Sequence, residues 1–206
     1  MAGTGSNDYR ARKVFVPDHH TVDAIAFHAG ETEGSKLHSN PLYSIPFLIS
    51  AYCTILPVLT GSLKGALSAF DQGFQQRVRN FGGEVVRDQQ QAHITLGEMT
   101  MASMMATELA RAVFSAAEKT MGRRPFTLED RIETKAKTSF VAKLCRDTVN
   151  SMMANAGASS FHLDQPLQRI WRDLNMVCSH AFWDWDVTRE AVGRHRLGLA
   201  QTNPLV

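Results

Sequence analysis

The sequence predicts an all-α protein: an up-and-down four-helix bundle with an extra short C-terminal helix and a short N-terminal β remnant. Three observations support this fold class. Beyond residue 46, apolar residues recur at helical spacing. Proline and glycine divide this part into segments far longer than a strand, and the connections are short, which favours antiparallel neighbours. We expect residues 1–40 to form the β remnant and a linker, and residues 41–206 to form the bundle.

The first forty residues differ from the rest of the chain. Residues 13–17 and 22–27 contain β-branched and aromatic residues; we predict a short strand for the first and either a second short strand or an extended segment for the other. Residues 29–40 contain Gly, Ser, Glu and Lys without periodicity and are predicted to be a loop. Because two short strands do not make a stable sheet by themselves, they must pair with backbone outside this chain or lie against the helices.

Proline and glycine mark the ends of the first two predicted helices. The first, over residues 47–79, follows Pro46, has an expected kink or restart near Pro57, and ends before Gly82. The second covers residues 87–121, and its methionines are interpreted as adaptable core filler rather than a ligand surface. Its apolar stripe, at spacings near 3.5, consists of Ile94, Met101, Met105, Leu109, Ala112 and Ala116.

Three further helices complete the prediction. Thr127 and Asp130 form a capping-box pattern that opens the third helix, which stops at Gly157. The fourth helix covers residues 163–183 and the short fifth helix covers residues 187–196. Helices this long and apolar are expected to bury more than one face, which predicts a homo-oligomer held together by helix–helix contacts.

Composition and charge argue against several function classes. The 206 residues carry 22 Lys and Arg against 20 Asp and Glu, and a net charge of +2 argues against a dedicated nucleic-acid binder. The longest apolar patch, residues 45–59, is interrupted by prolines and polar residues, so we expect no membrane span. The first residues do not resemble a signal peptide. The three widely spaced cysteines fit neither a disulfide framework nor a zinc site, which predicts a reduced, cytoplasmic protein.

Several common catalytic motifs are absent from the sequence. A di-iron bundle needs two Glu-x-x-His pairs on facing helices, and the sequence contains none. There is also no P-loop, no Gly-x-Gly-x-x-Gly after a strand and no Gly-x-Ser-x-Gly. We therefore predict no metal site, and two polar clusters remain as candidates.

The first cluster lies at the end of the first long helix and the start of the second. It contains Arg77 and Arg79, followed by Gln89 and Gln90. Arginines at a helix end, with amides opening the next helix, can hold a phosphate or pyrophosphate. The alternative is a solvated helix end whose cations interact favourably with the helix dipole. Spacing alone favours the solvated helix end.

The second cluster lies on the predicted fourth helix. Arg169, Asp173, Met176 and His180 follow one another at steps of four, three and four, which places them on one helix face. One interpretation is an acid–base histidine in a dry pocket. The other is a buried Arg–Asp pair that joins two helices, with a hydrogen-bonded core histidine beside it. We favour the structural interpretation for the Arg–Asp pair; the pattern leaves both interpretations of His180 open.

Four motifs follow one another along the sequence: Val14-Phe15-Val16-Pro17, the helix end Arg-x-x-x-Phe-Gly, Gly157-Ala158-Ser159 and Leu167-Gln168-Arg169-x-x-Arg172-Asp173-x6-His180. With these motifs the chain resembles the C-terminal half of flavin-dependent monooxygenases with the acyl-CoA dehydrogenase fold. This two-component group includes 4-hydroxyphenylacetate and secosteroid phenol hydroxylases, with relatives that act on indoles and dibenzothiophene. The resemblance covers essentially the whole chain, and its last motif is the most specific.

The resemblance implies roles for individual residues. Residues 1–28 correspond to the last strands of the family's middle β-domain, and residues 46–200 to its tetramer-forming C-terminal helical domain. The resemblance implies that His180 is catalytic and faces the flavin ring and the substrate. The residues implied in cofactor binding are Arg77 or Arg79 with Gln89 or Gln90, which match the region that reaches the flavin phosphates, often across a subunit interface, and also Arg169 and Gly157.

The implied activity is hydroxylation of an aromatic or heteroaromatic substrate with reduced FAD or FMN supplied by a separate flavin reductase. An acyl-CoA dehydrogenase-type oxidoreductase is the first alternative, although residues 176–183 contain a histidine and no catalytic glutamate. The second alternative is a non-catalytic helical oligomerisation module. Full-length relatives in this family are about twice as long, so the N-terminal helical domain and most of the β-domain have no counterpart in this sequence.

Overall fold

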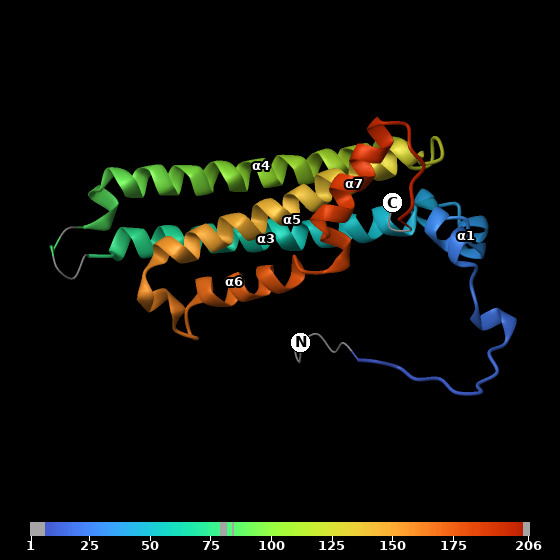
Figure 1. Cartoon of the computed structure of the whole chain (residues 1–206), viewed down its shortest axis with the longest axis horizontal. Coiled ribbons are helices and arrows are strands. Elements are labelled where there is room, and N and C mark those ends of the chain that lie inside the picture. The colour runs from blue at the N-terminus through green and yellow to red at the C-terminus, as the bar shows by residue number, and fades with distance from the viewer. Residues whose placement is uncertain (1–6, 79–81, 84, 204–206) are drawn as a thin grey trace.

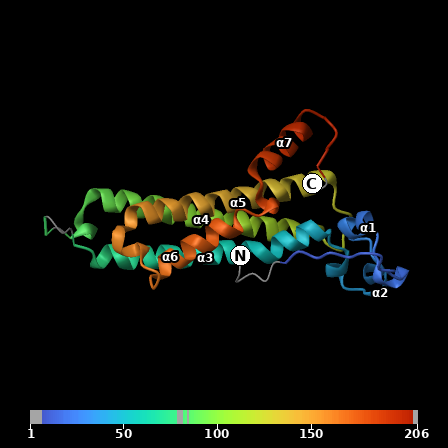
Figure 2. The ribbon, with the colours of Figure 1, turned by 60° about the horizontal axis from the view of Figure 1, so that its bottom comes forward.

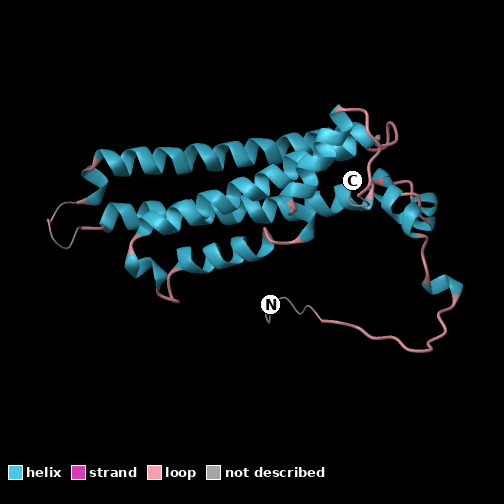
Figure 3. Ribbon diagram, viewed as in Figure 1, coloured by secondary structure: helices cyan, strands magenta, loops and turns pink. Residues whose placement is uncertain are grey.

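The computed structural model describes residues 7–78, 82–83 and 85–203, and in these ranges it contains helices and no strand. Four helices alternate in direction (Figure 1), and Figure 3 shows the helical content of the whole molecule. This arrangement confirms the predicted all-α bundle with a short C-terminal helix. The helices are α1 Ala24–Ala29, α2 Glu33–Leu37, α3 Phe47–Gln76, α4 Gln90–Thr120, α5 Leu128–Ala156, α6 Pro166–Val177 and α7 Trp185–Arg196.

The two parallel helices α3 and α5 form the centre of the bundle. Each of them contacts both α4 and α6, while α7 packs against α5 (Figure 2). Their shared seam is buried and mostly apolar, which is the usual origin of bundle stability. One polar contact, between Tyr52 of α3 and Lys135 of α5, also lies in it. The largest buried apolar side chains of α3 and α5 are Ile49, Tyr52, Leu56, Leu59, Leu63 and Phe70 from the first helix and Val141, Val149 and Met152 from the second.

Helix α3 is continuous from Phe47 to Gln76 and contains Pro57 in its interior. The predicted restart near Pro57 is therefore wrong. Leu56 and Leu59, on either side of this proline, are both completely buried, so packing holds the helix together across the missing N–H. The helix also ends three residues earlier than predicted, and Arg77 already has extended backbone.

By length and composition alone, α3 could also cross a membrane, with a mean hydropathy of 1.4 over an 18-residue window. In the structure this helix contacts α4, α5 and α6. Within this chain these contacts bury one stripe of α3, and 28% of the apolar window is buried.

The apolar stripe that the sequence suggested for the core side of α4 points outward instead. Ile94, Met101 and Met105 are 55%, 62% and 51% exposed, respectively. Helix α4 lies on one side of the central pair, where small residues allow close helix approach. The side chains of α4 that are buried are Ala92, Thr95, Met99, Ser103, Ala106, Ala110, Val113 and Thr120. The prediction that the methionines fill the core holds for Met99 alone among the four at positions 99, 101, 104 and 105.

The predicted N-terminal strands do not form. Residues 14–16 are exposed and belong to no strand, Lys13 has a positive φ of 51°, and the Pro17 carbonyl accepts a hydrogen bond from the His20 N–H in the following 3-10 turn. Residues 24–29 form α1 instead. Asp23 caps this helix, because its side chain accepts a hydrogen bond of 2.8 Å from the Ala26 N–H. A strand requires a neighbouring strand. Without a neighbouring strand, residues 14–16 do not become part of a sheet.

The capping box at the start of α5 is confirmed. Thr127 Oγ1 accepts a hydrogen bond from the Asp130 N–H, and Asp130 accepts one from the Thr127 N–H. The guanidinium of Arg124 binds both carboxylate oxygens of Asp130. This pairing, with the Thr127 hydrogen bonds, holds the pKa of the Asp130 carboxyl well below its usual range.

We predict that Asp130→Ala lowers the free energy of unfolding at neutral pH by about 1–2 kcal/mol, because it removes the cap and the Arg124 partner. The control is Glu133→Ala, which removes an exposed i,i+4 pair with Lys137 and should cost no more than about 0.5 kcal/mol. Urea unfolding followed by circular dichroism measures both.

The same prediction has a defined pH dependence. Because the pKa of Asp130 is lower in the folded state, its contribution is fully present above an unfolded-state pKa of about 3.9 and is lost as the pH falls through the folded value. The stability difference between the wild type and Asp130→Ala should therefore narrow in acid. An equal decrease in the free energy of unfolding for Asp130→Ala and Glu133→Ala at neutral pH would contradict a stabilising role for the Asp130 cap.

Candidate active site

A cavity of about 260 Å³ lies at the end of the bundle where α3 and α5 end and α4 begins (Figure 1). It brings together three predicted cofactor-binding residues, Arg77, Gln89 and Gly157, from three separate segments. Gln90 is exposed in the first turn of α4 and does not line this cavity. Arg79 lies outside the described residues. The complete lining is Phe74, Arg77, Val86, Gln89, Gln91, Ala92, Thr95, Ala154, Asn155 and Gly157.

Arg77 joins the ends of the two central helices. Its backbone caps α3, and its guanidinium donates a hydrogen bond of 2.9 Å from Nη1 to the Asn155 carbonyl in the last turn of α5. A cation is favoured there because the final carbonyls of a helix carry partial negative charge. The Val86 N–H donates to the Arg77 carbonyl at 2.9 Å, which fixes the backbone on the other side of the connecting loop.

Gly157 is required by this position of Arg77. A Cβ atom on residue 157 would lie 2.7 Å from the Arg77 Cζ atom, and the backbone φ of +86° is in the region that favours glycine. The glycine therefore both ends α5 and leaves room for the guanidinium. The shared Gly-Ala-Ser motif begins at this residue.

The donors around the cavity suit a phosphate group. Arg77 supplies a positive charge that is bonded to a neutral carbonyl, and none of the ion pairs found in the described ranges includes it. The N-terminus of the 31-residue helix α4 adjoins the cavity through Gln91 and Ala92. A guanidinium beside a long helix N-terminus is a favourable environment for an anion. These residues therefore fit the phosphate groups of a flavin nucleotide.

His180 is not part of α6, which ends at Val177. It instead caps the single 3-10 turn Ala181–Trp183, where its Nδ1 atom accepts a hydrogen bond of 3.2 Å from the Phe182 N–H. The His180 and Phe182 rings make a T-shaped contact with centroids 4.5 Å apart. In this chain His180 is exposed, so it is neither a core histidine nor enclosed in a dry pocket of this chain.

The predicted buried Arg–Asp pair is also wrong. Arg169 and Asp173 are both exposed on α6, and no ion pair between them occurs in the part of the chain that the structure describes. Helix α6 buries Leu167 and Leu174 against its neighbours, so its polar face must turn outward. The sequence signal for the buried face, which the prediction of a buried Arg–Asp pair did not use, is the apolar stripe of Leu167, Ile170, Leu174 and Val177.

The cavity and His180 lie at opposite ends of α6. The 12 residues of this helix span about 18 Å at 1.5 Å per residue. Arg169 lies on the exposed side between them and is not part of the cavity lining. A ligand that contacts both Arg77 and His180 must therefore be elongated.

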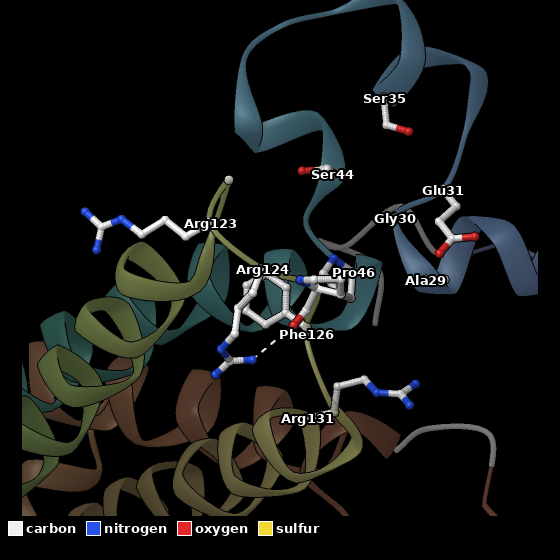
Figure 4. A pocket seen from close by; sticks show the side chains of 12 residues that line it. Ala29, Gly30, Glu31, Ser35, Ser44, Pro46, Arg123, Arg124, Phe126 and Arg131 are labelled. Carbon is white, nitrogen blue, oxygen red and sulfur yellow. Dashed lines mark hydrogen bonds between the residues drawn. The ribbon is translucent and has the colours of Figure 1, made fainter.

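A larger cavity, of about 510 Å³, lies at the other end of the bundle and contains Arg123, Arg124 and Arg131 in its lining. Figure 4 shows that these three side chains point in different directions. Arg124 is already bound to Asp130. The three cations do not converge on one point, so this cavity offers no comparable anion site.

Residues 53–185 match the family model described as acyl-CoA dehydrogenase, C-terminal domain. The chain belongs to this family.

Curated relatives align with nearly the whole chain. The acyl-CoA dehydrogenase C-terminal domain described here is 36% identical to a pigment production hydroxylase of Rhodococcus sp. (strain ATCC 21145), an alignment that covers 100% of this chain and 53% of the relative. It is 26% identical to the oxygenase component of the FADH(2)-dependent resorcinol hydroxylase of Rhizobium sp. (strain MTP-10005), with coverages of 97% and 51%. The chain spans about half the length of the curated relatives it matches.

Solved structures share the fold of this domain. The 3-HSA hydroxylase from Rhodococcus sp. RHA1 superposes with a TM-score of 0.84 at 23% identity, over 95% of this chain and 51% of the other. XiaF from Streptomyces sp., solved in complex with FADH2 and glycerol, superposes with a TM-score of 0.83 at 21% identity, over 94% and 49%. Both superpositions again cover about half of the longer protein.

We predict that Gly157→Ala lowers the free energy of unfolding by about 1–2 kcal/mol, because the new methyl group is strained at positive φ and meets the Arg77 guanidinium. Gly97→Ala is the control, since nothing lies within 4 Å of a Cβ in the middle of α4. That substitution should instead stabilise the protein by about 0.5–1 kcal/mol. Urea unfolding measures both, and effects of the same sign would contradict the assignment of Gly157.

Proposed function

We propose that this chain is the C-terminal part of the oxygenase component of a two-component flavin-dependent hydroxylase that acts on an aromatic substrate. The observation that carries the proposal is the cavity in which Arg77, Gln89 and Gly157 meet beside the N-terminus of α4. The printed names of the relatives support it, because they are hydroxylases or monooxygenases that align over 97–100% of this chain.

The proposed cofactor is reduced FAD, delivered by a separate flavin reductase. FADH2 appears in the names of both a curated relative and a structural neighbour. Reduced flavin activates dioxygen for transfer of one oxygen atom to the substrate ring. In this chain Arg77 and the start of α4 would hold the phosphates, and the length of α6 separates them from His180. Titration with reduced FAD and reduced FMN compares the two flavins.

His180 is proposed to contact the substrate through Nε2. Its Nδ1 atom faces the Phe182 N–H, which can only donate, so the neutral ring carries its proton on Nε2. A ring in this state donates a hydrogen bond to a phenolic or carbonyl oxygen. The geometry therefore favours hydrogen bonding to the substrate over removal of its proton, which is the other role of a histidine at this position.

We predict that His180→Ala reduces coupled hydroxylation about 10²-fold or more, the usual effect of removing a positioned proton donor or acceptor. The protein expressed from its complete reading frame is assayed with a flavin reductase, oxygen and phenolic substrates, and product is compared with reduced flavin consumed. His162→Ala is the control, since His162 is exposed between α5 and α6. Unchanged coupling in His180→Ala would contradict the proposed role.

Two further measurements, with an acyl-CoA as reductant and by titration with reduced flavins, would replace the proposed function on the following outcomes. Reduction of bound flavin by an acyl-CoA, without oxygen, would identify an acyl-CoA dehydrogenase-type enzyme. Failure of the protein to bind either reduced flavin would indicate a non-catalytic helical module.

The proposed assembly is a homotetramer in which helical faces pack between copies. The exposed apolar side chains of α4, Ile94, Met101, Met104 and Met105, support this proposal. An apolar groove of about 490 Å³ between α5 and α7 contains Phe140 and Trp185, whose ring centroids are 5.9 Å apart. Figure 1 shows α4 along one side of the bundle, where a second copy has access to it.

We predict that Met101→Lys combined with Met105→Lys lowers the oligomeric state, because two charges would be buried in the interface. Light scattering after size-exclusion chromatography measures the mass. The control is Thr100→Lys, a substitution at an exposed polar position on the same helix. An unchanged mass for the double variant would exclude this face of α4 from the interface.

Residues 1–40 are proposed to be the end of a β-domain and its linker. The exposed apolar side chains Tyr9, Phe15 and Ile25 support this, since they are 95%, 86% and 82% exposed in the chain alone.

A cytoplasmic location is also proposed. It is supported by the three free cysteines, two of which, Cys145 and Cys178, are buried with thiol pKa values raised by burial to about 12 and about 11.

A further inference from the structure

Lys135 is a lysine in the core of the bundle. It lies on α5 with only 1% of its surface exposed. Its Nζ atom is 3.4 Å from the Tyr52 hydroxyl oxygen of α3 and 3.5 Å from the Phe182 carbonyl oxygen. No ion pair found among the described residues includes Lys135. Burial of an ammonium group without a bonded carboxylate is unfavourable, so this lysine requires an explanation beyond packing.

The electrostatic surroundings of Lys135 are consistent with a structural hydrogen-bond donor. Burial lowers the pKa of its ammonium group, and the charge of Asp184, the N-cap of α7, partly offsets this effect. Burial also raises the pKa of Tyr52 to about 12, so the phenol remains neutral. Lys135 therefore has two neutral oxygen neighbours, one of which belongs to the turn after α6.

A short series of contacts connects Lys135 to His180. Phe182 is held at its carbonyl by Lys135, while its ring makes a T-shaped contact with the Tyr52 ring at 5.8 Å. On its other side, Phe182 donates its N–H to Nδ1 of His180 and packs its ring against the imidazole. Trp183, which is buried, also packs on Tyr52 with ring centroids 5.6 Å apart. Phe182 is the residue through which the core fixes the exposed histidine.

We propose that Lys135 is a positioning residue for His180: by binding the Phe182 carbonyl it fixes the turn Ala181–Trp183 and so maintains the hydrogen bond from the Phe182 N–H to Nδ1. The consequence for hydroxylation, an Nε2–H group held toward the substrate, rests on the proposed function. Lys135 binds the Phe182 carbonyl, whereas His180 accepts a hydrogen bond from the Phe182 N–H, which belongs to the preceding peptide group. Lys135 therefore acts through the position of the turn and does not touch the hydrogen bond of His180 directly.

The turn needs such an anchor. The turn Ala181–Trp183 has three residues and lies within the connection from α6 to α7. His180, which precedes it, is exposed. A single 3-10 turn has little stability by itself, since its hydrogen bonds are few and poorly aligned. Contacts with the core therefore decide whether the turn persists, and Lys135 is the charged group of the core that reaches it.

The test is Lys135→Met in the full chain, because methionine retains an apolar stem and lacks the donor. With uniform ¹⁵N labelling and a neutral imidazole, NMR measures two properties: the coupling across the hydrogen bond between the Phe182 nitrogen and Nδ1 of His180, and exchange of the Phe182 amide hydrogen. We expect Lys135→Met to lose the coupling and to exchange this hydrogen about tenfold faster, as loss of one hydrogen bond predicts. His180→Ala identifies the histidine signals.

Two further variants control the test. Lys143→Met removes a lysine from the partly exposed side of the same helix, where it pairs with Asp147, and should leave both properties unchanged. Tyr52→Phe keeps the aromatic ring and the contact between Lys135 and Phe182, and should also retain the coupling. The Tyr52→Phe variant also tests the proposal if Lys135→Met does not fold. Loss of the coupling in Tyr52→Phe would show that the Tyr52 hydroxyl fixes the turn, and would overturn the proposal. Retention of the coupling and the slow exchange in a folded Lys135→Met protein would overturn it as well.

Neither measurement requires flavin. If the Lys135→Met variant loses the coupling while the complete protein shows no hydroxylation, the positioning role stands and the proposed function fails. If the complete protein hydroxylates a substrate but the Lys135→Met variant keeps the coupling, the proposed function stands and the positioning role of Lys135 fails.

Discussion

The parallel packing of α3 against α5 determines where the polar residues of this domain lie. Most side chains in the seam between these helices are apolar and buried, and each side chain of the size of Leu59 or Val141 removed from water contributes about 1.5–3 kcal/mol. Because the two helices run in the same direction, their C-termini meet at one end and their N-terminal halves at the other. Arg77 bonds to Asn155 at the first end, and Tyr52 meets Lys135 towards the second.

The ends of the helices were predictable because they depend on local chemistry. The Thr127 capping box and the glycine at position 157 act within a few residues of the chain, and the structure has both where the sequence places them. The end of α6 was not predictable in this way. The helix ends at Val177 although the helical pattern of the sequence continues to Trp183, and His180 opens a separate 3-10 turn.

Which face of each helix is buried was harder to predict, because an apolar stripe does not show which surface packs against it. On α4 the more apolar face is exposed and a face of small residues is buried, since close helix packing favours alanine, serine and threonine at the contact. Residues 13–17 show the same limit. Their composition suits a strand, but strand formation depends on a neighbour that the described part of the chain does not supply. The buried Lys135 had no sequence signal, since lysine is rarely found in a core.

The two cations that organise the site are each bonded to backbone carbonyls rather than to carboxylates. Arg77 donates to Asn155 and Lys135 to Phe182, and neither forms an ion pair within the described residues. A carbonyl fixes the direction of a donor without cancelling its charge. At Arg77 the remaining positive charge is available to an anion in the adjacent cavity. Lys135 is buried from solvent, and its hydrogen bond to the Phe182 carbonyl fixes the turn that carries the exposed imidazole of His180. That single 3-10 turn is too short to be stable by itself.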